Sequence, residues 1–95
     1  MITKLKYSNS LLPSSISSNL VSNLKKLRKN AKYSQQELAI RSGVSLGSIK
    51  RFERTGKISL EALLKIAHVL NRLEDFVNVF RYDDTIDKVK AKFDI

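Results

Sequence analysis

Hydrophobic residues in the first half of the chain recur every three or four positions, with polar residues between them, which is typical of amphipathic helices. The first such run predicts a helix that begins at Ser17 or Ser18, either of which can cap it, and ends near Asn30. Its apolar positions are Leu20, Val21, Leu24 and Leu27. Residues 1–16 contain Ser, Asn and Pro without this periodicity, so they are expected to form an N-terminal arm.

A second helix is predicted over residues 35–42 by signals at both of its ends. Ser34 and Glu37 have the spacing of a capping box, in which the hydroxyl accepts from the third helical N–H and the carboxylate reaches back. Gly43 follows the last helical position, where a residue with positive φ commonly ends a helix.

Two more helices are predicted in the same way. Ser45 is a suitable cap for a third helix that runs to about Arg54, and Gly56 interrupts the pattern after it. Ser59 caps a fourth helix through Leu70. Its expected apolar face consists of Leu60, Leu63, Leu64, Ala67 and Leu70.

The remainder of the chain has weaker patterns. A short fifth helix is predicted over residues 73–80, and the alternating apolar residues of 81–95 are compatible with a strand. The expected fold is therefore all-α, with five helices. It divides into an arm (1–16), a helical domain (17–80) and a C-terminal tail (81–95).

Composition restricts the class of protein. With 95 residues, 42% hydrophobic and 28% charged, the chain fits one globular domain. It has no cysteine, which excludes disulfides and cysteine-based zinc sites. No apolar run approaches the roughly 18 residues of a membrane span, and the N-terminus lacks a signal-peptide core. A soluble, cytoplasmic protein without membrane contact and without cofactor is expected.

Charge is concentrated in the middle of the chain. The formal net charge is +9, and residues 17–58 alone carry ten Lys or Arg against two Glu, a net charge of +8. Such a concentration suits a polyanionic partner, although a merely solvated basic surface is the alternative.

Residues 35–54 have the features of two short helices joined by a tight turn. Ala39 is small where the helices would cross, and Gly43 stands at the turn. Four apolar residues are spaced to point into one core: Leu38, Val44, Ile49 and Phe52. Four others are expected to face away: Leu46, Gly47, Lys50 and Arg51. An ordinary helical hairpin would show the same pattern.

Residues 18–76 resemble the Xre/Cro family of helix-turn-helix regulators. The shared motifs, in order, are LKKLR, SQQELA, GVS, SIKRFE and SLEALLKIAHVL. The resemblance implies a five-helix, lambda-repressor-like domain, dimeric binding to a pseudo-palindromic operator on double-stranded DNA, and transcriptional repression.

The resemblance also suggests roles for residues around the second and third helices. It implies that Gln35 holds a DNA phosphate, where the free N–H groups of a helix start also favour an anion. It implies a structural ion pair between Arg28 and Glu53, which links the first helix to the end of the recognition helix.

DNA contacts are expected from the third helix. Ser45, Leu46, Gly47 and Ser48 form its first turn, which would enter the major groove. Lys50 can donate to guanine and Leu46 can touch a thymine methyl group. Arg51, Arg54 and Lys57 are expected at phosphates. Gly47 either permits close approach to DNA or is simply tolerated. A glycine inside a helix lowers stability by about 1 kcal/mol relative to Ala.

An apolar cluster near the C-terminus predicts self-association. Phe76, Val79, Phe80 and Tyr82 are expected in a homodimer interface, although they could instead close the core of the monomer. Residues 50–70 look like the antitoxins paired with HipA-type kinase toxins, which implies an autorepressor with a toxin partner. Phage-type and restriction–modification controller regulators share the motif, and a protein-binding adaptor with this fold is a further alternative.

Enzymatic chemistry is not expected. His68, the only histidine, has no ligand or catalytic partner at suitable spacing and is expected at the surface. Asp83, Asp84 and Asp87 lack the regular spacing of a calcium loop. The basic residues are not opposed by one long apolar face, which disfavours an anionic-membrane binder.

Overall fold

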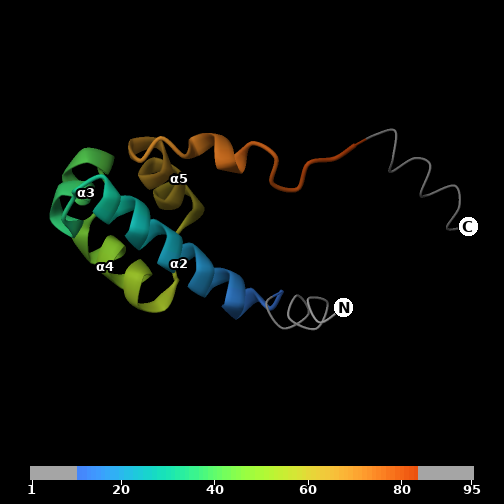
Figure 1. The fold of residues 1–95 in the computed structure, drawn as a ribbon, viewed down its shortest axis with the longest axis horizontal. Helices are drawn as coiled ribbons and strands as arrows, with labels where there is room; N and C mark the ends of the chain where they lie inside the picture. Colours follow the sequence, from blue (N-terminus) through green and yellow to red (C-terminus); the bar gives the residue numbers. More distant parts are fainter. Residues whose placement is uncertain (1–10, 84–95) are drawn as a thin grey trace, which may run out of the picture.

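A computed structural model describes residues 11–83 of the chain. Within this range the structure contains four α-helices, one short 3-10 turn and no strand (Figure 1). The elements are α2 (Pro13–Asn30), α3 (Gln35–Ser42), α4 (Leu46–Thr55), α5 (Leu60–Val69) and η1 (Leu73–Phe76). The predicted all-helical class is confirmed. The predicted fifth helix over residues 73–80 is wrong, because that stretch contains only the four-residue η1.

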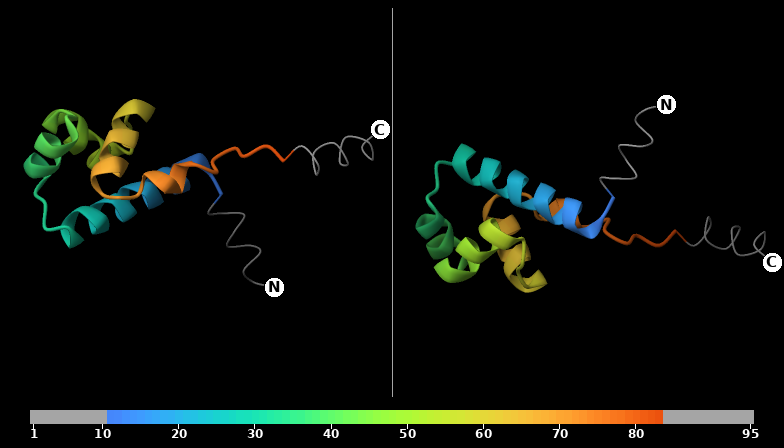
Figure 2. Two further views of the ribbon diagram at one scale, coloured as in Figure 1. Left: turned by 90° about the horizontal axis from the view of Figure 1, so that it is seen from above. Right: turned by 90° about the horizontal axis from the view of Figure 1, so that it is seen from below.

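The three shorter helices lie together on one side of α2, which is the longest helix (Figure 2). Helix α3 packs against α4 and α5, and α2 packs against α4. After α5 the chain turns back and η1 runs alongside it. This arrangement leaves the outer side of α4 uncovered, which is the side that matters for function.

Helix α2 begins earlier than the pattern of apolar residues suggests. Pro13 occupies its first turn and Leu12 is the N-cap, without a side-chain cap. Proline suits this position because its φ is already helical and its missing N–H would have no partner there. The serines that looked like caps therefore lie inside the helix, and residues 13–16 are helical rather than part of an arm. Residues 1–10 lie outside the described range.

Serine side chains cap the other three helices as predicted. The Oγ atoms of Ser34, Ser45 and Ser59 accept hydrogen bonds from backbone N–H groups three residues later, at 3.0, 3.1 and 3.1 Å. The Glu37 carboxylate, which the capping box predicted to reach back to the start of α3, instead accepts a hydrogen bond from Arg41 Nε at 2.7 Å.

The core is formed where α2, α3, α4 and α5 meet. Its buried members are Leu24, Leu38, Val44, Ile49, Phe52 and Ile66. The predicted apolar face of α5 needs correction at two positions. Leu60 is 67% exposed, whereas Ile66 is completely buried, because Leu60 is the first residue of the helix while Ile66 lies within the core cluster.

The C-terminal part of the described chain is mostly exposed. Phe76 is half-buried, whereas the other three residues of the predicted dimer cluster, Val79, Phe80 and Tyr82, are exposed. They do not close the monomer's core. Residues 81–83 form no strand, and the rest of the predicted tail, 84–95, lies outside the described range together with Asp84 and Asp87. None of the helices in residues 11–83 has the length and apolarity to cross a membrane.

Candidate nucleic-acid interface

A fixed turn sets the angle between α3 and α4. Gly43 has a φ of +75° and donates its N–H to the Ala39 carbonyl at 2.9 Å, which ends α3. The Val44 N–H then donates to Ser42 Oγ at 3.2 Å. A residue with a Cβ would be strained in this backbone conformation. Glycine at position 43 therefore permits the sharp change of direction between α3 and α4.

Helix α4 is divided into a buried face and an exposed face. Ile49 and Phe52 anchor it in the core, with exposed fractions of 0% and 2%. The exposed face carries small and basic side chains: Gly47, Ser48, Lys50, Arg51 and Arg54. Leu46, predicted to face away, is half-buried at the start of the helix.

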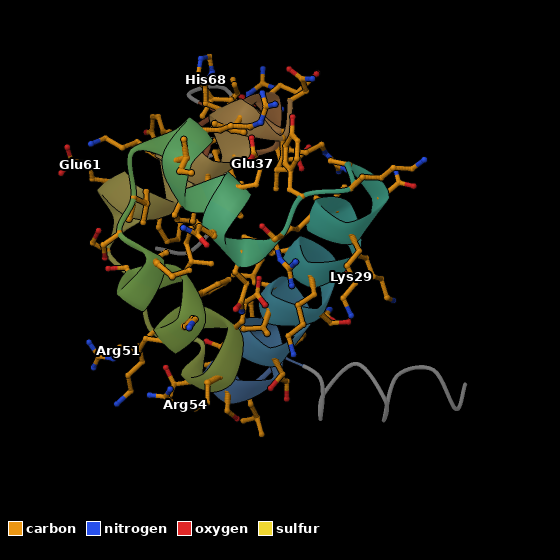
Figure 3. All side chains as sticks on the ribbon, turned by 90° about the vertical axis from the view of Figure 1, so that its left-hand side faces the viewer. Lys29, Glu37, Arg51, Arg54, Glu61 and His68 are labelled. Atoms are coloured by element: carbon orange, nitrogen blue, oxygen red, sulfur yellow. The ribbon has the colours of Figure 1, made fainter. Side chains whose placement is uncertain are left out.

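The basic residues of this face form no ion pair with an acidic residue in the range 11–83. Among residues 11–83, ion pairs join Arg28 to Glu53, Arg41 to Glu37, Lys65 to Glu61 and Arg72 to Asp75. Lys50, Arg51, Arg54 and Lys57 take part in none of them. Figure 3 shows Arg51 and Arg54 extending outward from α4, whereas Glu61 and His68 lie toward the other end of the domain. The exposed side of α4 is therefore a surface of uncompensated positive charge, suited to an anion.

A buried ion pair ties the end of α4 to α2. Arg28 donates from Nε and Nη2 to the two carboxylate oxygens of Glu53 at 2.8 and 3.0 Å, and from Nη1 to the Tyr33 carbonyl at 2.9 Å. The side chains are only 11% and 4% exposed. This is the contact that the sequence resemblance implied, and its bidentate geometry fixes the orientation of both partners.

Gln35, the first residue of α3, joins the same network. Its Nε2 donates to Glu53 Oε1 at 2.9 Å. The amide is thus held between α3 and α4, beside the free N–H groups that begin α3. One N–H donor of the Gln35 amide is thus used within the protein, which the sequence did not indicate. The contact of Gln35 with a DNA phosphate stays a prediction.

The surroundings of Glu53 favour the ionised form of its carboxyl group. Burial alone would raise the pKa of Glu53, but hydrogen bonds from Arg28 and Gln35 and the charges of Arg28 and Lys25 lower it below its ordinary value. The carboxylate is therefore a structural charge that these partners compensate. It does not present a repulsive charge to DNA phosphates.

A hollow between α4 and α5 gathers further polar groups that the sequence reasoning did not connect. It is open and has a volume of about 430 Å³, and its polar lining residues are Ser48, Arg51, Lys57 and Ser59. Ser59 had been recognised only as a cap. The spacing of Arg51 and Lys57 around the turn at Gly56 was the signal that could have placed them together.

Comparison with known proteins identifies the family. The helix-turn-helix family model HTH_3 matches residues 24–76, which is more than half of the chain. The chain belongs to this helix-turn-helix family. No curated protein and no solved structure matches it. The family and the exposed basic helix indicate a DNA-binding transcription regulator, in which α3 and α4 form the helix-turn-helix.

The structure brings most of the predicted DNA-contact residues of this helix-turn-helix protein onto one side. Those in the range 45–57 all belong to α4, its cap and the turn that follows it, and Gln35 lies next to Glu53 at the end of α4. The predicted dimer residues are in a separate region after α5. His68 is exposed, as expected. Among residues 11–83 no group of His, Cys, Asp or Glu is arranged to hold a metal.

Gly47 offers a test of how closely α4 approaches DNA. A Cβ at Gly47 would meet no atom within 4 Å, so Gly47→Ala should stabilise the protein by about 1 kcal/mol in thermal or urea unfolding. If the missing side chain admits DNA, the same variant should bind operator more weakly. Gly56→Ala is the contrasting control. Its φ of +79° and the Ser17 Cβ at 3.2 Å predict a loss of stability. Unchanged operator affinity in Gly47→Ala would refute the close approach.

Proposed function

We propose that this protein is a sequence-specific transcriptional repressor that binds a pseudo-palindromic operator as a homodimer in the cytoplasm. The observation that carries the proposal is the exposed face of α4. Lys50, Arg51 and Arg54 are exposed on it and pair with no acidic residue of the described part of the chain, on a helix that a buried ion pair holds in place.

The proposed mechanism assigns separate tasks to this face. The first turn of α4 enters the major groove, where exposed Ser48 and open Gly47 allow the backbone to come near the bases. Lys50, one turn later, donates to a guanine edge. Arg51, Arg54 and Lys57 neutralise phosphates on either side and fix the register of the helix on the duplex.

Repression follows from occupancy of the operator. Two copies related by a two-fold axis would place two α4 helices in successive major grooves, about 34 Å apart. A dimer of this span covers DNA that RNA polymerase must contact. The exposed Val79, Phe80 and Tyr82 support self-association, because monomers seldom leave neighbouring large apolar side chains uncovered.

A narrower role, as the autoregulating antitoxin of a HipA-type toxin, stays a prediction. It rests on the resemblance of residues 50–70 to such antitoxins, a segment that phage-type and restriction–modification regulators share. Co-expression with the product of the neighbouring gene, followed by purification of a stable complex, would support it. Growth inhibition by that product alone, relieved by this protein, is the second requirement.

The direct test of the repressor is a titration against DNA upstream of its own gene. At physiological salt, the wild type should bind this duplex much more tightly than a scrambled one. Lys50→Ala should reduce that preference by about 1–3 kcal/mol, the value of one good base contact. Lys65→Ala is the matched control, because Lys65 is a half-exposed lysine on α5 that pairs with Glu61.

The result also separates the repressor from the adaptor alternative. Equal, weak binding to both duplexes by the wild type would exclude autoregulation at that site. A protein adaptor would show no duplex preference at any site, including operators selected from random sequence.

A further inference from the structure

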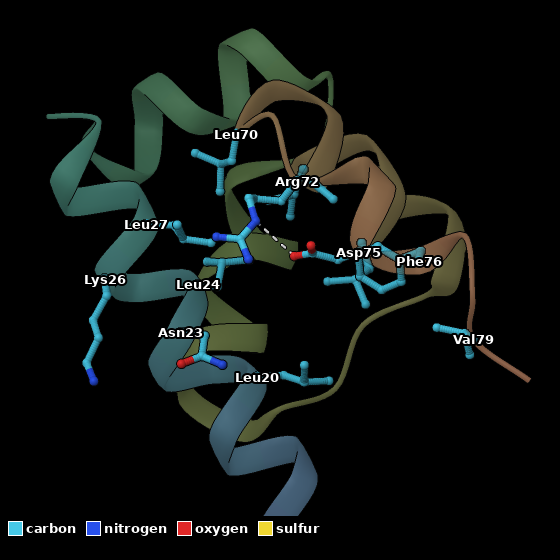
Figure 4. A pocket seen from close by; sticks show the side chains of 13 residues that line it. Leu20, Asn23, Leu24, Lys26, Leu27, Leu70, Arg72, Asp75, Phe76 and Val79 are labelled. Carbon is cyan, nitrogen blue, oxygen red and sulfur yellow. Dashed lines mark hydrogen bonds and ion pairs between the residues drawn. The ribbon is translucent and has the colours of Figure 1, made fainter.

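An open apolar groove lies between α2, α5 and the segment that follows α5 (Figure 4). Its volume is about 550 Å³, and apolar side chains form most of its walls. The apolar lining residues include Leu20, Leu24, Leu27, Leu63, Phe76 and Val79. The rim is polar, with Lys26 on α2 and an ion pair between Arg72 and Asp75 across from it.

Phe80, the residue after Val79 of the groove, combines an exposed side chain with an unusual backbone conformation. Its side chain is 99% exposed, and its backbone has a φ of +57°, in the left-handed region that bulky residues rarely occupy. Such a conformation is unfavourable unless surrounding contacts hold it. A fully exposed phenylalanine gains no such contact from residues 11–83, so the molecule displays a strained, apolar side chain next to an apolar groove.

We propose that Phe80 of one copy inserts into the groove of a second copy, and that the second copy's Phe80 does the same in return. The inference rests on the proposed function, because it specifies how the repressor dimer would form. In a two-fold dimer each contact occurs twice, so one ring and one groove per protomer make a closed, self-complementary interface.

The groove has room for this ring. An apolar cavity of about 150 Å³ is enough for benzene, so a groove of about 550 Å³ can receive the ring together with neighbouring side chains. Val79 lines the groove and precedes Phe80 directly, so the segment that donates the ring also forms part of a wall.

The exposed aromatic side chains after α5 supply part of the area that a dimer interface needs. Phe80 at 99% and Tyr82 at 66% exposure offer about 300 Å² together, given 150–250 Å² for a whole aromatic side chain. A standard interface buries about 800 Å² per partner. The groove walls and the neighbouring Val77, which is 75% exposed, add to this area.

Sedimentation equilibrium of the full chain without DNA provides the first test. Phe80→Asn removes the ring but keeps a residue that tolerates positive φ, and it should raise the dimer Kd by roughly 10- to 100-fold, as for an interface hot spot. Ile40→Asn is the control, because Ile40 is 70% exposed on α3, which does not line the groove. Equal Kd values for the wild type and Phe80→Asn would overturn the proposal.

Disulfide cross-linking provides the second test, since the chain contains no cysteine. Two single variants that keep the Phe80 ring, Arg81→Cys and Leu20→Cys, are mixed and oxidised, one of them carrying a mass tag. The expected product is the covalent heterodimer, and a mixture of Arg81→Cys with Ile40→Cys should give little of it. If the groove is instead filled by residues 84–95 of its own chain, or by another protein, the heterodimer will not form.

Failure of this inference differs from failure of the proposed function. If Phe80→Asn remains dimeric and still selects the operator, the repressor stands and the interface lies elsewhere. If the wild type dimerises through the groove but shows no duplex preference, the groove exchange stands and the repressor does not.

Discussion

Replacing Glu53 with alanine is expected to lower the free energy of unfolding by about 3–5 kcal/mol, as breaking a buried ion pair usually does. The loss is large because Arg28 stays buried without its carboxylate, and Gln35 loses its acceptor at 2.9 Å. Small domains have only about 5–15 kcal/mol of stability in total. Urea unfolding followed by circular dichroism measures the change, and a marginal domain would already be partly unfolded at 37 °C.

The double variant Arg28→Met, Glu53→Leu is the control for this result. It removes both charges and fills their space with apolar atoms, so its stability should be much closer to wild type than that of either single variant. The surface pair offers a contrast, because Glu37→Ala breaks an exposed contact with Arg41 and should cost under about 1 kcal/mol. A Glu53→Ala loss as small as that of Glu37→Ala would contradict the structural role of the pair.

The pH dependence of the same pair has a definite sign. Because the pKa of Glu53 is lower in the folded protein than its ordinary value of 4.5, the ionised form contributes stability above pH 4.5. That contribution is lost as the pH falls below 4.5 and the folded protein takes up the proton. The stability difference between wild type and Glu53→Gln should therefore be largest near neutral pH and shrink below pH 4.5.

The sequence predicted the parts of the fold that local chemistry determines. Ser34, Ser45 and Ser59 cap helices because a short hydroxyl side chain satisfies a free N–H wherever the helix begins. Gly43 and Gly56 end helices because both adopt positive φ, which most other residues avoid. These signals depend on a few neighbouring residues, so the bounds of α3, α4 and α5 agree closely with the prediction.

Errors arose where packing, rather than local preference, decides the structure. Leu60 and Ile66 both belong to an apolar helix, and only contact with the other helices determines which one is buried. The residues after α5 contain enough apolar side chains for a helix, yet the chain forms only η1 and then a series of turns that leave Phe80 exposed. Nothing in the periodicity indicates a groove that those side chains leave open.

The candidate site was predictable in position but not in its internal connections. Lys50 and Arg51 could be assigned to an exposed face from the helical period and the buried positions between them. The hydrogen bond from Gln35 to Glu53 could not, because it joins residues eighteen apart whose distance depends on the packing of α3 against α4. That bond links a residue expected at phosphate to the pair that orients α4.

The remaining prediction concerns salt, because the basic residues after the first turn of α4 should act mainly on the phosphate backbone. Arg51, Arg54 and Lys57 in each of two protomers would neutralise about six phosphates, which gives a log–log slope of affinity against salt near −5. Operator affinity should therefore fall roughly 1,000-fold between 50 and 200 mM salt. Fluorescence anisotropy with a labelled operator measures the slope directly.

Single variants divide this slope among residues. Arg54→Gln removes one phosphate contact per protomer, so the magnitude of the slope should decrease by about 2, and operator and scrambled DNA should weaken equally. Lys50→Ala should weaken the operator far more than scrambled DNA, because a base contact carries sequence information and a phosphate contact does not. If Arg54→Gln leaves the slope unchanged, Arg54 does not contact a phosphate. If Lys50→Ala weakens both duplexes equally, its assignment to a base is wrong, and α4 then approaches the duplex in a different register.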